Sequence, residues 1–143
     1  MSDVEERQQA AYAANCRIET PAGWFYFDDP KLDLSAAAHS LAQVNRYNGH
    51  GRFPFSVATH SVLVSLLMEE VTGGDPFEGL WHDRAEFVMS DIPAPVKPQL
   101  PDWRALDKKV DSAFAIQLGQ AAGKSLECHK ADMLALFIEA YQL

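Results

Sequence analysis

His82 and Asp83 are adjacent, and together they offer an imidazole nitrogen and a carboxylate oxygen, two side-chain groups that bind divalent metals. Side chains one position apart on a helix point about 100° away from each other, so both reach one ion only when it lies against the side of the helix. Taken alone, the pair fits a capping or surface pair better than a metal site. The neighbouring residues are apolar and indicate a helix: Leu80, Trp81, Phe87 and Val88.

Two further candidate ligands lie far from this pair in the sequence. His60 lies between Val57 and Val64 on the inward-leaning face of an expected helix, where a histidine is either a hydrogen-bonded core residue or a metal ligand. Asp132 is surrounded by apolar residues of the last expected helix, and an acid in such surroundings is rarely buried without a partner. We therefore expect a cationic group to face Asp132.

The four residues would supply two imidazole nitrogens and two carboxylates from three separate helices. Such a mixed set suits one borderline or hard divalent ion, namely Mn²⁺, Co²⁺, Fe²⁺, Zn²⁺ or Mg²⁺. Coordination positions would remain open for water and substrate. The residue types therefore predict one divalent-metal site that a small molecule can reach.

The hydrophobic periodicity predicts an all-α chain in which about five helices carry these residues. Ser35 and Ser56 are the expected N-caps of the first two helices. The prolines between Asp91 and Pro98 rule out a continuous helix, so this segment is expected to be a fixed loop. The expected helices run from Ser35 to about Asn48, from Val57 to about Val71, from Pro76 to Met89, from Asp102 to about Leu118, and from Leu126 to the C-terminus.

The chain length of 143 residues fits one globular domain. We expect residues 1–17 to form an N-terminal arm and residues 18–143 to form the single domain. An aromatic run, Trp24–Phe27, is too short for a helix and is expected to be an edge strand or a packed arm.

The overall charge disfavours some classes of partner. The chain has 12 basic and 20 acidic residues, a net charge of −8, and its basic residues are scattered, so duplex nucleic acid is not an expected partner. A small anion such as a nucleotide stays possible, because a metal ion or a local cluster of donors suffices to bind it. The N-terminus is polar, no apolar stretch is long enough for a membrane span, and Cys16 and Cys128 lack a paired spacing. We therefore expect a cytoplasmic protein without a membrane partner.

Taken in order, several short blocks resemble those of HD-domain phosphohydrolases, in particular the bacterial and phage 5′-deoxynucleotidases. The resemblance spans roughly residues 18–143 and implies a compact HD-domain helical bundle of about five to six helices. Any one block is a weak signal, whereas their order is specific. The blocks are RYNGH at 46–50, FSVA at 55–58, THSVLV at 59–64, HDRAE at 82–86, SDIPAPVK at 90–97 and KAD at 130–132.

By this resemblance, His60, His82, Asp83 and Asp132 would hold one divalent metal ion, and Asp83 and Glu86 would be the catalytic residues. Glu86 would orient or deprotonate the attacking water. It lies one turn after the His-Asp pair on the same helix face, so its carboxylate is placed to reach a water that the ion has made more acidic. The alternative for Glu86 is a surface glutamate paired with a neighbouring base.

The same resemblance implies four substrate contacts. Arg46 resembles an arginine that clamps the phosphate, because a guanidinium binds two phosphate oxygens at once; the alternative is a solvated arginine at a helix end. Tyr47 stands where an aromatic residue lies close to the sugar, although a core aromatic is equally compatible. Asp91 resembles the acid that meets the sugar 3′-hydroxyl, or it is only a cap or turn residue. Lys97 would add positive potential at the end of the loop.

The implied activity is that of a 5′-deoxynucleotidase, which hydrolyses deoxynucleoside 5′-monophosphates, and a homodimer is usual among the proteins it resembles. One alternative is a deoxynucleoside triphosphate triphosphohydrolase, which the small size and the short spacing from Asp83 to Asp132 favour. Another is a nucleotide-binding HD module without hydrolysis, against which the intact ligand set and Glu86 argue. Hydrolysis of cyclic dinucleotides or guanosine tetraphosphate is less favoured, because the segments around Arg46 and Asp91 resemble the mononucleotide branch.

Two departures from the family pattern concern single positions. Arg84 is bulky and charged where relatives often carry a small residue, and we expect it to reach the phosphates or to alter specificity. Met89-Ser90 replaces the usual Thr-Gly before Asp91.

Overall fold

The aromatic run near the N-terminus forms one strand of a hairpin. The structure is a computed structural model that describes residues 2–7 and 16–142, so the expected arm over residues 1–17 lies partly outside the described residues. Strand β1 (Arg17–Thr20) pairs antiparallel with β2 (Gly23–Tyr26). The Thr20 hydroxyl closes the turn, because it accepts from the Ala22 amide at 3.2 Å and donates to the Gly23 carbonyl at 2.7 Å. The chain is therefore mostly helical rather than purely α.

The first long helix, α2 (Leu34–Leu41), is shorter than expected and has a different N-cap. Asp33 caps it, because its carboxylate accepts a hydrogen bond of 2.8 Å from the Ala36 amide, so the assignment of Ser35 was wrong. The helix cannot continue to Asn48, since Tyr47 and Asn48 take left-handed conformations with φ of 58° and 50°.

Helix α3 (Val57–Leu67) begins as predicted, with Ser56 as its N-cap and the Ser56 hydroxyl accepting from the Thr59 amide at 3.1 Å. A π-helical turn (Met68–Thr72) extends it to Gly73, whose φ of 73° ends the helix. The expected end of this helical segment near Val71 is therefore confirmed.

The single helix expected from Pro76 to Met89 was wrong. The chain forms α4 (Pro76–Trp81) and α5 (Glu86–Met89), which a turn over residues 82–85 separates. Backbone bonds from Arg84 to Trp81 and from Glu86 to Asp83 span three residues, and such bonds are tighter than those of an α-helix. The interruption places His82 and Asp83 in a turn, where His82 still keeps right-handed torsions with φ of −64° and ψ of −31°.

The last two long helices match their predicted positions closely. The proline segment is irregular up to a 3₁₀ turn (Lys97–Gln99), and α6 (Pro101–Gln117) follows it. Helix α7 (Leu126–Gln142) completes the described chain. No helix in the described part is long and apolar enough to cross a bilayer.

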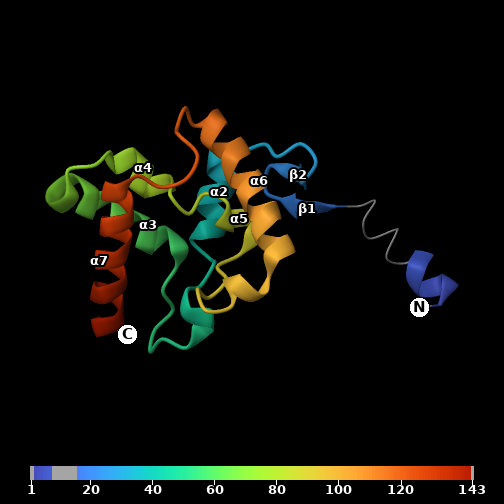
Figure 1. The fold of residues 1–143 in the computed structure, drawn as a ribbon, viewed down its shortest axis with the longest axis horizontal. Coiled ribbons are helices and arrows are strands. Elements are labelled where there is room, and N and C mark those ends of the chain that lie inside the picture. Colours follow the sequence, from blue (N-terminus) through green and yellow to red (C-terminus); the bar gives the residue numbers. More distant parts are fainter. Residues whose placement is uncertain (1, 8–15, 143) are drawn as a thin grey trace.

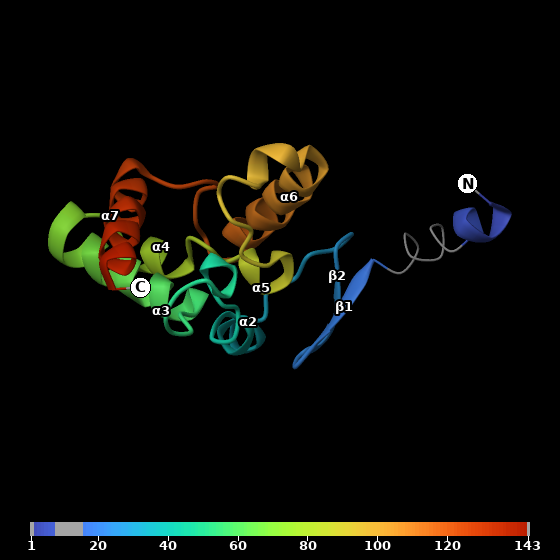
Figure 2. The same ribbon diagram turned by 90° about the horizontal axis from the view of Figure 1, so that it is seen from below.

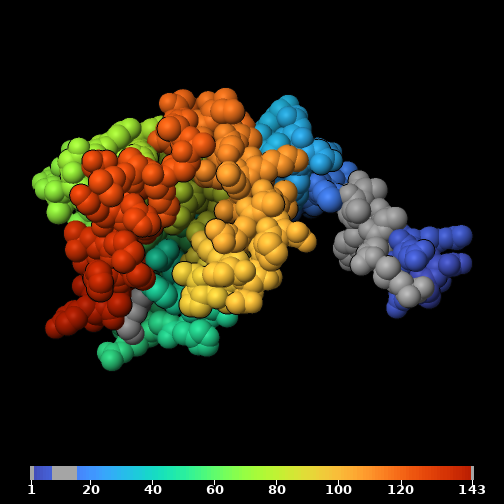
Figure 3. Space-filling view, viewed as in Figure 1, coloured from blue at the N-terminus to red at the C-terminus, as the bar shows by residue number. Residues whose placement is uncertain are grey.

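The helices pack around two apolar clusters. Helix α7 lies beside α3 and contacts α4 at one side of the molecule, whereas α6, α5 and the hairpin occupy the other side (Figures 1 and 2). Gly79 lets α4 approach α3 closely, because a Cβ at this position would lie 2.9 Å from the Ser65 Cα. Between the two halves the surface is hollowed beside α7 and the start of α6 (Figure 3), and a cavity there is lined by residues of both halves.

Candidate metal centre

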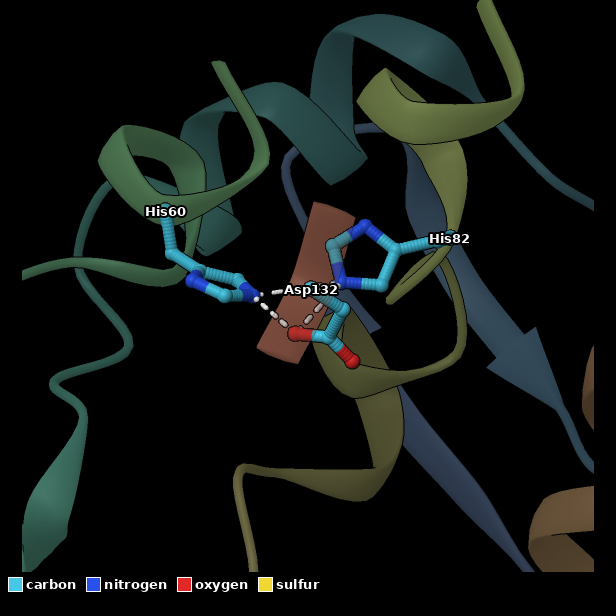
Figure 4. A group of neighbouring side chains, drawn as sticks. All are labelled: His60, His82 and Asp132. Atoms are coloured by element: carbon cyan, nitrogen blue, oxygen red, sulfur yellow. Dashed lines mark hydrogen bonds and ion pairs between the residues drawn. The ribbon is translucent and has the colours of Figure 1, made fainter. Parts of the chain in front are cut away.

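Three predicted ligands from separate elements meet at one point. His60 comes from α3, His82 follows α4, and Asp132 comes from α7, and their ligand atoms all lie within 4.8 Å of one another (Figure 4). The two Nε2 atoms are 3.2 Å apart, and Asp132 Oδ1 is 3.0 Å from that of His60 and 3.7 Å from that of His82. This buried group could hold a metal ion.

Asp83 presents its carboxylate to the same two imidazoles. Its Oδ2 lies 3.0 Å from His82 Nε2 and 3.5 Å from His60 Nε2. Both side chains of this adjacent pair reach the same point because that point lies against the side of the turn that carries them. The structure thus brings together all four residues that the sequence singled out as ligands.

The other nitrogen of each imidazole already has a partner. His82 Nδ1 lies 2.7 Å from the Gly79 carbonyl oxygen, which can only accept, so this nitrogen donates. His60 Nδ1 bonds to a carboxylate oxygen of Glu139. Ligating histidines usually bind a carbonyl or carboxylate through the second nitrogen, which leaves the first as a lone-pair donor.

The spacing of the donors fits a bound cation. Two ligands about 2.1 Å from one atom lie about 3 Å apart when they subtend roughly a right angle. The two Nε2 atoms are separated by 3.2 Å, and the carboxylate oxygens approach them at 3.0 Å. Two nitrogens and two carboxylates suit a borderline or hard divalent ion.

The charges of the site favour a cation at this point. Burial by itself lowers the pKa of His60 and His82, but the carboxylates of Asp83 and Asp132 outweigh it and leave both pKa values raised. Burial raises the pKa of the two aspartates, yet the imidazoles and Lys124 hold both below the usual range. Protons on the imidazoles and a divalent ion would satisfy the same negative charge.

Lys124 is a functional candidate that the sequence reasoning missed. Its Nζ pairs with Asp132 Oδ2 at 2.5 Å, the oxygen that does not face the imidazoles. The expectation that a cationic group faces Asp132 is met by this lysine and the two imidazoles. The sequence could have pointed to Lys124 through its position, because it lies two residues before α7, the helix that carries Asp132, at the end of the glycine-containing segment after α6.

Glu86 is buried beside the four residues. Burial, reinforced by the charges of Asp83 and Asp91, raises the pKa of its carboxyl group to about 10. One of its oxygens, Oε2, has no hydrogen-bond partner within residues 2–7 and 16–142. Glu86 is therefore a buried acid rather than a surface glutamate with a basic partner.

The site opens into a cavity of about 460 Å³. Its wall contains three ligand or acid residues of the site, Asp83, Glu86 and Asp132, together with Lys124. The structure also brings the four predicted substrate contacts to this wall: Arg46, Tyr47, Asp91 and Lys97. A second cavity of about 390 Å³ shares Asp83, Glu86, Lys97 and Lys124 with the first.

A second acid that the sequence reasoning missed, Glu139, lies behind the cavity on α7. It is 2% exposed and accepts hydrogen bonds from Tyr47 and Arg46. Burial opposes its ionisation, but bonds to His60 and Tyr47 leave the Glu139 pKa lowered. The signal was its spacing, because Glu139 follows Asp132 by seven residues and so lies two turns further on nearly the same helix face.

Of the two roles expected for Arg84, contact with the phosphates is not supported, and an effect on specificity stays a prediction. Arg84 is 2% exposed, lines neither cavity and forms an ion pair, with its Nε 2.8 Å from Asp111 Oδ1. Its Nη1 also donates to Gln120 Oε1 at 2.7 Å. Arg84 therefore ties the turn between α4 and α5 to α6 and the segment after it.

Comparison with known proteins finds relatives but no assigned activity. No family model matches the chain. YfdR of Escherichia coli K12 is 34% identical over 122 residues, which covers 83% of this chain and 67% of that protein. RCAP_rcc00048 of Rhodobacter capsulatus is 33% identical over 123 residues, covering 78% of this chain and 63% of that protein. The chain thus spans about two thirds of the length of these relatives, both of which are named as uncharacterized proteins.

Proposed function

Since the chain belongs to the family of the Escherichia coli protein YfdR, whose name assigns no activity, we propose from the site itself that it is a divalent-metal-dependent phosphohydrolase acting on nucleotides. The observation that carries the proposal is the convergence of two imidazoles and two carboxylates at the wall of a cavity with three cationic side chains. The order of the ligands along the helices supports assignment to the HD-domain phosphohydrolases.

His60, His82, Asp83 and Asp132 would hold the ion. A divalent ion bound there supplies positive charge that polarises a phosphoryl oxygen and makes a nearby water more acidic. Glu86 lines the same cavity, and its Oε2 has no hydrogen-bond partner among the described residues, so its carboxyl group is placed to orient the attacking water. It would take a proton from that water only where the charge of a bound ion lowers the Glu86 pKa from its raised value of about 10.

The cationic side chains would bind the phosphate. Arg46, Lys97 and Lys124 lie around the cavity wall, where the aspartates Asp83, Asp91 and Asp132 would otherwise repel an anion. Phosphoryl transfer depends mainly on positioning and on neutralising the charge of the phosphate oxygens, so the chain needs no nucleophile of its own. Binding and neutralising the phosphate is a role that these three cationic side chains would fulfil without forming a bond to phosphorus.

We propose deoxynucleoside 5′-monophosphates as the substrates. Asp91 lines the same cavity as the two carboxylate ligands, with its Oδ2 4.0 Å from Arg46 Nη1, and would accept a hydrogen bond from the sugar 3′-hydroxyl. The Tyr47 hydroxyl already donates to Glu139, so the ring, rather than the hydroxyl, would contact the sugar.

The second cavity favours one alternative substrate class, deoxynucleoside triphosphates. It adjoins the same Asp83 and Glu86 and adds Lys108 to the two lysines that both cavities share. A longer phosphate chain would find space and positive charge on that side of the ligands. Triphosphate release in place of phosphate would identify this activity.

The products released from a nucleotide panel test the function. Protein loaded with Mn²⁺ or Co²⁺ is incubated with dAMP, AMP and dATP, and the inorganic product is identified. We expect phosphate from dAMP, loss of both metal and activity in Asp83→Ala, and no change in the exposed control Asp29→Ala. Metal binding without hydrolysis of any nucleotide would favour a non-hydrolytic binding module, and a chain that binds no divalent metal would refute the proposal.

Substitution of Arg46 tests the phosphate contact. Arg46→Ala is expected to raise KM and to lower kcat, because the charge on the phosphate oxygens matters more in the transition state than in the ground state. Arg46→Lys keeps the charge but loses the planar fork, so it should restore activity only in part. Unchanged steady-state constants in Arg46→Ala would remove Arg46 from the substrate site.

A further inference from the structure

Glu139 contacts three residues of the proposed site, although it is itself neither a ligand nor a substrate contact. Its carboxylate bonds to His60 Nδ1, to the Tyr47 hydroxyl and to Arg46. We propose that Glu139 is a positioning residue that fixes both the His60 imidazole and the Arg46 guanidinium. The part that concerns Arg46 rests on the proposed function.

On the metal side, Glu139 determines which nitrogen of His60 faces the other ligands. Glu139 Oε1 bonds to Nδ1, and Nε2 then lies 3.2 Å from His82 Nε2 and 3.0 Å from Asp132 Oδ1. A carboxylate behind a ligating histidine fixes the orientation of the ring and makes it a stronger ligand, and loss of such a partner typically costs about 10- to 100-fold in metal affinity.

On the substrate side, Glu139 binds the inner edge of the guanidinium. Glu139 Oε2 lies 3.1 Å from both Nε and Nη2 of Arg46. The remaining nitrogen, Nη1, is 4.0 Å from Asp91 Oδ2 at the cavity wall. Glu139 thus holds Arg46 from behind and leaves Nη1 on the side of the cavity.

Packing alone does not account for an acid at this position. Ala131 and Ala135 precede Glu139 on the buried side of α7 and fill the interface with apolar groups. A buried carboxylate is costly unless it is well hydrogen-bonded, and an apolar residue of similar volume is often as stable. The free-energy cost of burying this carboxylate is explained if its hydrogen bonds orient His60 and Arg46 for their roles in the site.

The experiment compares Glu139→Gln with a matched control, Glu78→Gln. Glu78 is a partly buried acid that binds the Ser125 amide and hydroxyl at 2.7 and 2.8 Å, away from the four ligands. The first readout is the Mn²⁺ dissociation constant, measured by calorimetry on metal-free protein. The second is the NMR signal of the His60 Nδ1 proton, which a bond to a carboxylate shifts downfield and protects from exchange.

We expect Glu139→Gln to weaken Mn²⁺ binding about 10- to 100-fold and to remove the downfield signal, whereas Glu78→Gln changes neither. Glu139→Asp keeps the charge with a shorter reach and should fall between. If hydrolysis is found, Glu139→Gln should also raise KM. If the wild-type chain binds Mn²⁺ but hydrolyses no nucleotide, the proposed function fails while the affinity and the NMR signal still decide the role of Glu139.

Wild-type Mn²⁺ affinity in a folded Glu139→Gln protein would overturn the proposal. If Glu139→Gln does not fold, the role of Glu139 is tested by the NMR signal of the wild-type protein and by the Mn²⁺ affinity of Glu139→Asp. Absence of the downfield signal from the wild-type protein, or unchanged affinity in Glu139→Asp, would then count against the role.

Discussion

At the scale of single side chains, the candidate site depends on which nitrogen of each histidine is already engaged. His82 donates from Nδ1 to the Gly79 carbonyl, and His60 uses Nδ1 toward Glu139. Both Nε2 atoms therefore face the carboxylates of Asp83 and Asp132. The site combines the negative charge of these carboxylates with two Nε2 atoms, each of which supplies a lone pair to a divalent cation once that cation replaces the proton.

Glu86 gives a pH-dependent prediction for the metal-free protein. Its folded pKa is about 10 against an ordinary value of 4.5, so the folded state keeps a proton that the unfolded state loses between these values. The stability contribution is full below pH 4.5 and falls as the pH rises toward 10. Glu86→Gln removes this loss, so its melting temperature in EDTA should exceed that of the wild type increasingly from pH 5 to pH 9.

The matched control for this prediction is Glu69→Gln, because Glu69 is exposed. It should leave the pH dependence of the melting temperature unchanged. A gap between Glu86→Gln and the wild type that stays constant from pH 5 to pH 9 would show that Glu86 is already ionised in the folded protein and would contradict the raised pKa.

Residue types alone were enough to find the side chains that meet at the site, but not the groups behind them. His60, the His82-Asp83 pair and Asp132 stood out because each is a potential ligand in apolar surroundings. Glu139 is also an acid in apolar surroundings, on α7, but it matched none of the sequence blocks that pointed to ligands. Its bond to His60 is seen only once α7 is packed against α3. A hydrogen bond to the far side of a ligand, such as that from Glu139 to His60, depends on distances between helices, and the spacing of residues along the sequence does not predict these distances.

At the scale of elements, the short turn between α4 and α5 carries two adjacent candidate ligands. His82 keeps right-handed helical torsions there, and both His82 and Asp83 reach one point because that point lies against the side of the turn. The side chains of His82 and Asp83 in this turn, which spans residues 82–85, both lie against His60. The ion pair between Arg84 and Asp111 joins the turn to α6. The geometry of the site is therefore built by an irregular segment held between regular helices.

Ser90 predicts a stabilising substitution. Its φ of 69° and ψ of 166° lie in a region that is essentially restricted to glycine and costs other residues about 1–3 kcal/mol. Glycine also adds about 0.5–1 kcal/mol of unfolded-state entropy, so Ser90→Gly should raise the free energy of unfolding by about 1 kcal/mol in urea titrations.

Ser112→Gly is the control for the Ser90 prediction, since Ser112 lies inside α6, where glycine is unfavourable. The two substitutions should have opposite signs. A destabilised Ser90→Gly protein would mean that the backbone of Ser90 does not take this conformation.

Periodicity predicted the long helices better than the short ones. The bounds of α6 and α7 follow from their amphipathic spacing, and Ser56 and Gly73 mark the ends of α3 and its π-helical extension. The division of residues 76–89 was missed because their apolar pattern continues through the turn. The early end of α2 was missed because nothing in the residue types requires the left-handed backbone at Tyr47.

At the scale of the whole molecule, the site joins parts of the chain that are distant in sequence. His60 and Asp132 lie on α3 and α7, which pack side by side, and His82 and Asp83 lie in the turn that leads toward the other half (Figures 1 and 4). An ion that binds only when these parts are assembled stabilises the folded state over the unfolded state.

Metal binding should therefore raise the melting temperature. At a free ion concentration about 100 times the dissociation constant, binding adds about 2.7 kcal/mol, which corresponds to roughly 5–10 °C for a domain of this size. Thermal unfolding with Mn²⁺ or EDTA measures the shift, and Asp132→Asn should reduce it strongly. An equal shift in wild type and Asp132→Asn would place the ion elsewhere.

The most direct measurement is an anomalous difference map from a crystal of the protein soaked in Mn²⁺. The account predicts one peak contacted by Nε2 of His60 and His82 and by carboxylate oxygens of Asp83 and Asp132, at distances of about 2.0–2.3 Å. A map without a peak among these four side chains, while the soaked metal binds at another position, would contradict it.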